Sequence, residues 1–469
     1  MSGSLWDEYT SYSSYGYAKP LESRGDLLIL NLPMPLIGLR TPKPCQPFNK
    51  KRTATHQVAG PHVCIPFTRH LSSDSAPAVD LLTFSRFSSG AKLSVQIGRF
   101  KKKHMPSTSS KDLLSMTPEG LRHALSKYFE QKGLPAYRVG QVEKWIYKSL
   151  TSSIDQMTDV PLTERRDLCD QFSLIELRDA RIARSKDGTV KHVWQLSDGK
   201  LVESVLIPTR QRLTLCVSSQ AGCALGCTFC ATGWGGFERQ LSAGEIVSQY
   251  RASRRWAEGN GYGPITNIVY MGMGEPLANL GAVHDSLTIL NQGYKVGARR
   301  ITVSTVGVVP GILELARRPE QFGLALSLHA PLSKLREELI PLEKRYPLPD
   351  VIEALSQFQD SGGKRITYEY TMIRGINDDP ELIRPLANLA NRVRAFVNLI
   401  PYNPIPYQAW HPSSAERIHA FAKGLTKQGV SVAVRETRGS DIDAACGQLR
   451  AHALEKRASD VAEPQDSIN

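Results

Sequence analysis

The sequence lacks a long hydrophobic run. A membrane-spanning helix needs about 20 consecutive apolar residues, and no such stretch occurs among the 469 residues. The longest apolar run near the start, over residues 27–37, is interrupted by Asn31, Pro33 and Pro35. We therefore expect a soluble protein that has no membrane partner.

Acidic side chains are scarce in the first 110 residues, which hold 14 Lys and Arg but only 6 Asp and Glu. Hydrophobic periodicity is weak there, so we expect a disordered leader or extension over residues 1–110. This segment supplies +8 of the net charge of +13. The smaller excess in the rest of the chain is compatible with an RNA partner but does not identify one.

The leader has two interpretations. An acid-poor leader is typical of an organelle transit peptide, which would place the protein in a plastid or mitochondrion. However, four acids lie within residues 7–26, where transit peptides avoid them. Alternatively, translation starts downstream, at Met105 or Met116. We expect a cytoplasmic protein, with the organelle as the alternative.

No convincing secretion signal precedes the eight cysteines, which argues against a disulfide framework. Four of the eight, Cys216, Cys223, Cys227 and Cys230, fall within fifteen residues. Such clustering in a large chain favours metal or redox chemistry.

Two small modules are expected before the main domain. Residues 111–177 predict helices, because apolar residues recur at helical spacing after a start signal at Thr117-Pro118. Residues 178–212 contain three short extended runs separated by Asp-Gly turn signals, which predict a β meander that connects to the core.

From residue 213 the pattern alternates between strand and helix. Repeated strand–helix units predict a parallel sheet, open or rolled into a partial or full barrel, with its site at the carboxyl ends of the strands. The expected strands are Leu213–Ser218, Asn267–Gly272, Arg300–Ser304, Phe322–Leu328, Arg365–Met372, Phe396–Ile400 and Ser431–Arg435.

Three cysteines directly after the first of these strands, Cys223, Cys227 and Cys230, are spaced CxxxCxxC. Thiolates at this spacing can wrap one corner of an iron–sulfur cluster and leave one iron open for a ligand. A zinc site is the alternative, but it usually needs four protein ligands. Cys216 could be the fourth, yet it lies inside the strand.

Several motifs, in order, resemble the RlmN family of dual-specificity RNA adenine methyltransferases, of the radical S-adenosylmethionine (SAM) superfamily. The resemblance runs from about residue 114 to about residue 452. Its motifs are LCVSSQAGCALGCTFCATG at 215–233, MGMGEP at 271–276, VSTVG at 303–307, SLHA at 327–330, NLIPYN at 398–403 and RGSDIDAACG at 438–447.

The resemblance implies an α/β fold with a partial (β/α) barrel of the radical SAM type over residues 213–452, followed by a tail over 453–469. It implies that residues 111–177 form the accessory RNA-recognition domain. It also implies a [4Fe–4S] cluster on the three cysteines, SAM as cofactor, and an electron donor such as flavodoxin or ferredoxin. We expect a monomer.

The resemblance also assigns site residues. It implies that Cys446 carries the methyl group, that Cys216 is the second cysteine, and that Glu203 accepts a proton. Without it, Cys446 would be interpreted as a small buried hydrophobe and Glu203 as an exposed strand residue. The implied SAM contacts are Gly274, Glu275, Ser304, Ser327, Leu328, His329 and Asn403.

The implied reaction is methylation of carbon 2 of adenine in 23S rRNA, at the peptidyl transferase centre, and in tRNA, at the adenine 3′ of the anticodon. Two SAM molecules serve each turnover, one to methylate a cysteine and one to provide a radical. Two alternatives stay open. One is methylation of carbon 8, as in the related Cfr family; the other is an iron–sulfur RNA-binding factor without catalysis.

Overall fold

The computed structural model describes residues 110–362, 365–406 and 408–449, together with three short strands nearer the start. The chain divides into two units, Met1–Lys102 and Lys103–Asn469. In the first unit, strands β1 (Cys64–Phe67), β2 (Asp80–Thr83) and β3 (Gln96–Ile97) form an antiparallel sheet. The rest of the predicted leader and the predicted tail lie outside the described residues.

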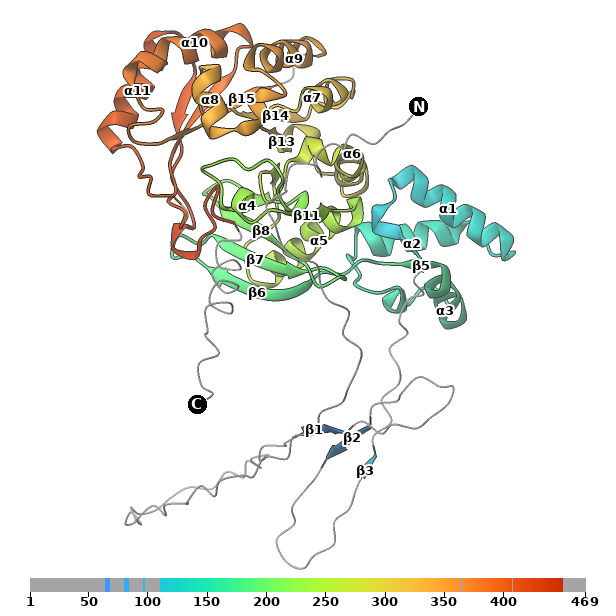
Figure 1. Cartoon of the computed structure of the whole chain (residues 1–469). Helices are drawn as coiled ribbons and strands as arrows, with labels where there is room; N and C mark the ends of the chain where they lie inside the picture. The colour runs from blue at the N-terminus through green and yellow to red at the C-terminus, as the bar shows by residue number, and fades with distance from the viewer. Residues whose placement is uncertain are drawn as a thin grey trace, which may run out of the picture. The chain divides into compact units, whose positions relative to one another are not determined.

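The second unit begins with the helices expected over residues 111–177. They are α1 (Pro118–Gln131), α2 (Tyr137–Tyr147) and α3 (Leu162–Gln171). Thr117 caps α1 by accepting a hydrogen bond from the Gly120 amide, and Pro118 occupies the first turn, where no amide donor is needed. The apolar residues spaced along α1 are buried in a separate small core with residues of α2 and α3. This module lies beside α5 (Ala243–Gly259) in Figure 1.

A ten-stranded open sheet forms the centre of this unit, in the order β17-β16-β15-β14-β13-β12-β9-β8-β7-β6. Its seven parallel strands are β9 (Leu213–Cys216), β12 (Asn267–Tyr270), β13 (Ile301–Thr305), β14 (Gly323–Ser327), β15 (Ile366–Met372), β16 (Phe396–Pro401) and β17 (Val432–Val434). All seven strands expected from the sequence are confirmed to within a few residues at their ends. In the part of the chain that the structure describes, β17 does not pair with β6, so the barrel is partial, as predicted.

The predicted meander is part of the same sheet. Its strands are β6 (Arg178–Arg184), β7 (Val190–Gln195) and β8 (Leu201–Pro208), and β8 pairs antiparallel with β9. Residues 178–212 therefore extend the core sheet, where the sequence predicted only a connection to it. This continuity brings side chains of the meander next to the parallel strands.

Side chains alternate between the two faces of the parallel strands, as the period of a strand requires. On β15, Tyr368 and Tyr370 lie in the main hydrophobic core, whereas Thr367 and Glu369 line an inner cavity of ≈ 780 Å³. The other strands follow the same rule, and the inward residues include Thr214, Asn267, Thr302 and Asn398. The inner face of the sheet therefore lines a cavity with both polar and apolar side chains, while the outer face is apolar and covered by helices.

The covering helices connect the parallel strands (Figure 1). Besides α5 they are α6 (Leu280–Thr288), α7 (Val309–Ala316), α8 (Ser333–Leu339), α9 (Leu348–Asp360), α10 (Ile383–Arg392) and α11 (Ala415–Lys427). A π-helical turn follows α6 at Ile289–Gly293. Single turns of 3-10 helix lie at Leu113–Ser115, Ile154–Gln156, Pro276–Ala278, Ala298–Arg300, Pro341–Lys344, Pro380–Leu382 and Ser440–Ile442. Two-residue strands β4 (Lys111–Asp112) and β5 (Phe172–Ser173) pair beside the helical module. None of the helices in the described part of the chain has both the length and the apolar character that a membrane crossing needs.

Candidate active site

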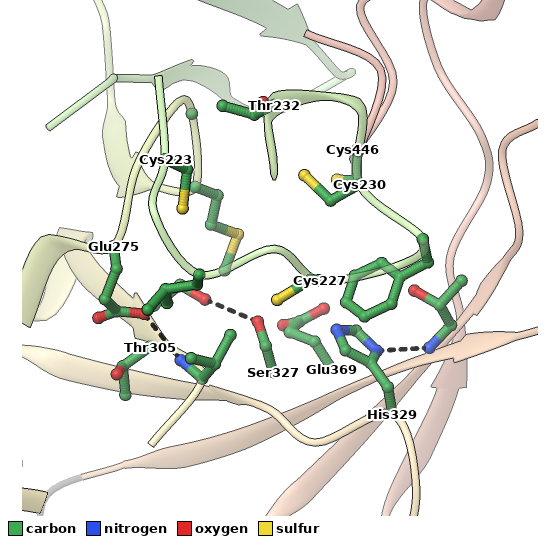
Figure 2. Close-up of a pocket in the computed structure, with 18 of the residues that line it drawn as sticks. Cys223, Cys227, Cys230, Thr232, Glu275, Thr305, Ser327, His329, Glu369 and Cys446 are labelled. Atoms are coloured by element: carbon green, nitrogen blue, oxygen red, sulfur yellow. Dashed lines mark hydrogen bonds between the residues drawn. The ribbon is translucent and has the colours of Figure 1, made fainter. Parts of the chain in front are cut away.

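The three cysteines of the CxxxCxxC motif lie on one loop at the carboxyl end of the parallel strands. The loop follows β10 (Gln220–Gly222), runs into α4 (Ala231–Trp234), and is backed by β11 (Phe237–Gln240), which pairs with β10. Gly226, in the middle of the motif, has φ of +63°, a conformation that favours glycine and lets the loop turn tightly. Figure 2 shows the sulfur atoms of Cys223, Cys227 and Cys230 around one space, a cavity of ≈ 140 Å³.

These cysteines suit a cluster better than a single ion. Among the described residues, no three His, Cys, Asp or Glu side chains converge closely enough to hold one metal ion. A cubane cluster needs no such convergence, because each thiolate binds a different iron. Burial raises the pKa of Cys223 to about 12 and that of Cys227 well above its usual range. Both thiols therefore need a metal cation beside them to become thiolates, as iron–sulfur ligation provides.

Glu275 lies in the same cavity, at the end of β12. Its carboxylate is buried and accepts hydrogen bonds from the amides of Leu277 and Val306, both at 2.9 Å. Burial raises its pKa to about 7. Gly274 beside it has φ of +98°, and a Cβ there would meet the side chain of Gln220 at 2.4 Å. The backbone can therefore pass this close to Gln220 only because residue 274 is glycine.

The predicted residues of β13 and β14 reach the same cavity, with one exception. Ser304 and Ser327 line it, with their hydroxyl oxygens 3.4 Å apart. Leu328 points the other way, into the main core, and its amide donates to the Glu369 carbonyl at 3.1 Å. The side chain of Leu328 therefore points away from this cavity, and Leu328 is not among the residues that line it.

His329 also lines the cavity and is buried in a left-handed conformation, with φ of +55°. Its Nδ1 accepts a hydrogen bond from the Thr371 amide at 3.0 Å, and its ring packs edge-on against Phe229 (Figure 2). Burial lowers its pKa to about 3. The imidazole is therefore neutral, with Nε2 as its remaining donor.

Cys446 comes to this site from beyond the last strand. The segment that carries it is held by the cysteine loop, since the amide of Ala231 donates to the Gly447 carbonyl at 2.7 Å. Asn403, a predicted SAM contact, donates from Nδ2 to the Cys446 carbonyl at 3.0 Å. Cys446 is exposed and lines both the small cavity and the larger inner cavity.

Cys216 and Glu203 lie on the neighbouring strands β9 and β8, and both are buried. Burial, and then the nearby Cys446 thiol, raise the pKa of Cys216 to about 12. Cys216 also packs in a small apolar cluster with Ala444, from the segment that carries Cys446. Glu203 forms an ion pair with Lys191, with Nζ and Oε1 3.7 Å apart. The structure thus brings the two cysteines together, while Glu203 is buried on β8 and is not among the residues that line the two cavities.

The sequence reasoning missed a charged pair at the boundary of the two cavities. Glu369 and Arg435 line both, with Nη1 and Oε2 3.9 Å apart, and Asn398 donates to Glu369 at 3.0 Å. Lys191 was also missed. The sequence did contain a signal for these two functional candidates. Glu369 and Lys191 are each the single Asp, Glu, Lys or Arg residue within their strand.

Two family models match the chain. The Radical SAM superfamily model matches residues 217–385, and the model for the ribosomal RNA large subunit methyltransferase N-terminal domain matches residues 111–174. A protein of Gemmatimonas aurantiaca named "Probable dual-specificity RNA methyltransferase RlmN" is 46% identical over 360 residues, which are 76% of this chain and 98% of that protein. The dual-specificity RNA methyltransferase RlmN of Alcanivorax borkumensis is 43% identical over 70% of this chain and 88% of its own length.

A solved structure agrees with these relatives. The crystal structure of a radical SAM methyltransferase from Sphaerobacter thermophilus matches with a TM-score of 0.69 and 44% identity, over 73% of this chain and 99% of that one. Radical SAM enzymes use a [4Fe–4S] cluster and SAM, and the cavity provides three cysteines and a buried carboxylate for them. The chain therefore belongs to the RlmN family of radical SAM dual-specificity RNA methyltransferases.

Proposed function

We propose that this enzyme methylates carbon 2 of adenine, both in 23S rRNA at the peptidyl transferase centre and in tRNA at the adenine 3′ of the anticodon. One observation carries the proposal: Cys446 lines both cavities, with the three motif cysteines on one side and the inner face of the sheet on the other. A residue in that position can collect a methyl group on one side and deliver it to a base on the other. The adenine must leave its stack to enter.

The residues of the small cavity suit the proposed cofactors. Cys223, Cys227 and Cys230 would hold the cluster, and the Glu275 carboxylate would accept hydrogen bonds from the amino group of SAM. Ser304, Ser327 and His329, with Gly274, would contact the rest of SAM from the small cavity. Asn403, which lines the inner cavity, and the backbone of Leu328 would complete the contacts. When bound, the cluster and SAM supply the methyl group and a carbon radical that abstracts hydrogen, with electrons from a donor such as flavodoxin or ferredoxin.

The chain's own residues then carry the methyl group. The Cys446 thiolate takes the methyl group from the sulfonium of SAM by nucleophilic substitution and becomes a thioether, and the rest of SAM would leave as S-adenosylhomocysteine. After this methyl loses one hydrogen atom, its carbon bonds to carbon 2 of the adenine, which leaves the adduct with one unpaired electron. Glu203 accepts the proton that carbon 2 must lose, and the extra electron would pass to the cluster held by the three motif cysteines. Cys216 then attacks the Cys446 sulfur, which breaks the sulfur–carbon bond and leaves a Cys216–Cys446 disulfide. The released carbon keeps the bonding electron pair and takes up a proton, which completes the methyl group. A reductant restores both thiols for the next turnover.

The test is anaerobic turnover of the reconstituted enzyme with SAM, a strong reductant, and either unmodified rRNA or unmodified tRNA. Nucleoside mass spectrometry reads the product. We expect 2-methyladenosine from the wild type, none from Cys446→Ala, and an unchanged yield from Cys169→Ala, whose cysteine lies in α3 of the helical module. A dominant 8-methyladenosine product would overturn carbon 2, and SAM cleavage without methylated RNA would overturn the proposed substrates.

A further inference from the structure

Lys191 is a buried lysine that the proposed mechanism does not use. It lies on β7, and its side chain is only 4% exposed. Burying an ammonium group is costly unless an opposite charge and hydrogen bonds compensate. A buried ion pair adds little to stability compared with an apolar pair of similar size, so its presence next to a reaction site calls for a functional explanation.

The Lys191 ammonium contacts two groups that belong to different parts of the chain. It lies 3.7 Å from Oε1 of Glu203, whose side chain is 8% exposed, and it donates to the backbone carbonyl of Asp443 at 3.0 Å. The strand register explains the first contact. Lys191 pairs with Val205 and Val193 pairs with Glu203, so the two charged residues are diagonal neighbours on one face of the sheet.

The second contact fixes the segment that carries Cys446. Asp443 lies three residues before Cys446 and has φ of +50°, a left-handed conformation that aspartate tolerates better than most residues. The carbonyl groups of Cys446 and Gly447 are held from the opposite side, by Asn403 and Ala231. Lys191 therefore links the carboxylate of Glu203 to one end of this segment.

We propose that Lys191 is a positioning residue that keeps the Glu203 carboxylate charged and in a fixed place relative to Cys446. This inference rests on the proposed function, in which the carbon 2–hydrogen bond breaks, the proton goes to Glu203 and the bonding electron pair stays in the ring. Only an ionised carboxylate can accept that proton. Without its cationic partner, a buried carboxylate favours the neutral, protonated form.

The test compares Lys191→Met with Lys191→Arg, which keeps the charge, and with Lys186→Met, an exposed lysine of the adjoining turn, as the matched control. We expect Lys191→Met to lower the yield of 2-methyladenosine by about 100-fold, the size of a general-base contribution. Lys191→Arg should recover most of this loss, and Lys186→Met should match the wild type. Peptide mass spectrometry should find methylated Cys446 at the wild-type level in all of them.

Two further readouts separate a role through Glu203 from a role in folding. With deuterium on carbon 2 of the target adenine, Lys191→Met should show a larger kinetic isotope effect than the wild type, because proton removal has become slow. In the Glu203→Gln background, adding Lys191→Met should cause no further loss. The double variant removes both buried charges, so it leaves no unpaired charge in the sheet. We therefore expect it to fold even if Lys191→Met alone does not.

Three results would overturn the inference. They are a Lys191→Met yield equal to that of Lys186→Met, a loss of methylated Cys446 in proportion to the product, or an additive loss in the Glu203→Gln background. If the wild type makes no 2-methyladenosine, the proposed function fails first and this inference fails with it. The wild-type reaction therefore distinguishes the two failures.

Discussion

At the scale of single residues, burial decides which groups are charged. His192 is fully buried, stacks on Trp194 with ring centroids 4.7 Å apart, and meets Trp256 edge-on. Burial, and then the charge of Arg184, lower its pKa to about 4. The ring is therefore neutral in the folded protein at neutral pH, although an exposed histidine would gain a proton below about pH 6.5.

The shifted pKa of His192 predicts a loss of stability in mild acid. The unfolded chain binds a proton as the pH falls below about 6.5, while the folded chain resists until about pH 4. The free energy of unfolding should therefore decrease by about 2 kcal/mol for this residue between pH 7 and pH 5. Urea denaturation at both pH values measures it, and His192→Phe should show a decrease smaller by that amount. An equal decrease in the variant would contradict the prediction.

At the scale of elements, α5 connects the helical module to the barrel through one buried arginine. The Arg251 guanidinium donates to the carbonyls of Ile146 and Thr151, which are at the end of α2 and just after it, and to the Tyr294 hydroxyl. Arg251 is 3% exposed. These bonds satisfy carbonyl groups that have no other helical partner at the end of a helix. Arg251 therefore holds the module against α5, together with the hydrogen bonds that Arg255 and Ser248 donate to the carbonyls of Leu150 and Ile175.

Substitution of Arg251 should destabilise the protein far more than substitution of its neighbour Arg254. Arg251→Met leaves buried carbonyls without donors and should cost about 3 kcal/mol. Arg254 makes a partly exposed ion pair with Glu258 on the same helix, so Arg254→Met should cost about 0.5 kcal/mol. Equilibrium urea denaturation compares the two variants. Similar losses would mean that Arg251 does not hold the module in place.

At the scale of the whole molecule, the site depends on the second unit alone. Every residue assigned to the cluster, to SAM or to the chemistry lies within Lys103–Asn469. The relative from Gemmatimonas aurantiaca is matched over 98% of its length by 76% of this chain. We therefore predict that residues 1–102 are not needed for the family's site.

Deletion of residues 1–102 should accordingly leave the yield of methylated RNA within about 2-fold of the full chain, since a unit with its own core folds by itself. The measurement is nucleoside mass spectrometry on parallel reactions of the full and shortened chains, with cluster absorbance as a control for loading. A large loss of product with a normal cluster would show that the first unit contributes to RNA binding.

Local patterns in the sequence were sufficient for the fold and for the cofactor cysteines. The alternation of strand and helix patterns along the chain predicted all seven parallel strands, because each short apolar run is bounded by helical or turn signals. The CxxxCxxC spacing indicated an iron–sulfur cluster because its three ligands share one loop. Resemblance to the RlmN family, and not periodicity, singled out Cys446, Cys216 and Glu203.

Only the tertiary structure decided how distant residues meet. Lys191 and Asp443 are 252 positions apart in the chain, and their contact exists because the meander joins the core sheet under the last segment. The same folding placed Glu369 beside Arg435 and turned Leu328 away from the cavity. A sequence records which side chains a strand presents on each face. Which elements lie opposite that face depends on the closure of the whole sheet, which no local pattern encodes.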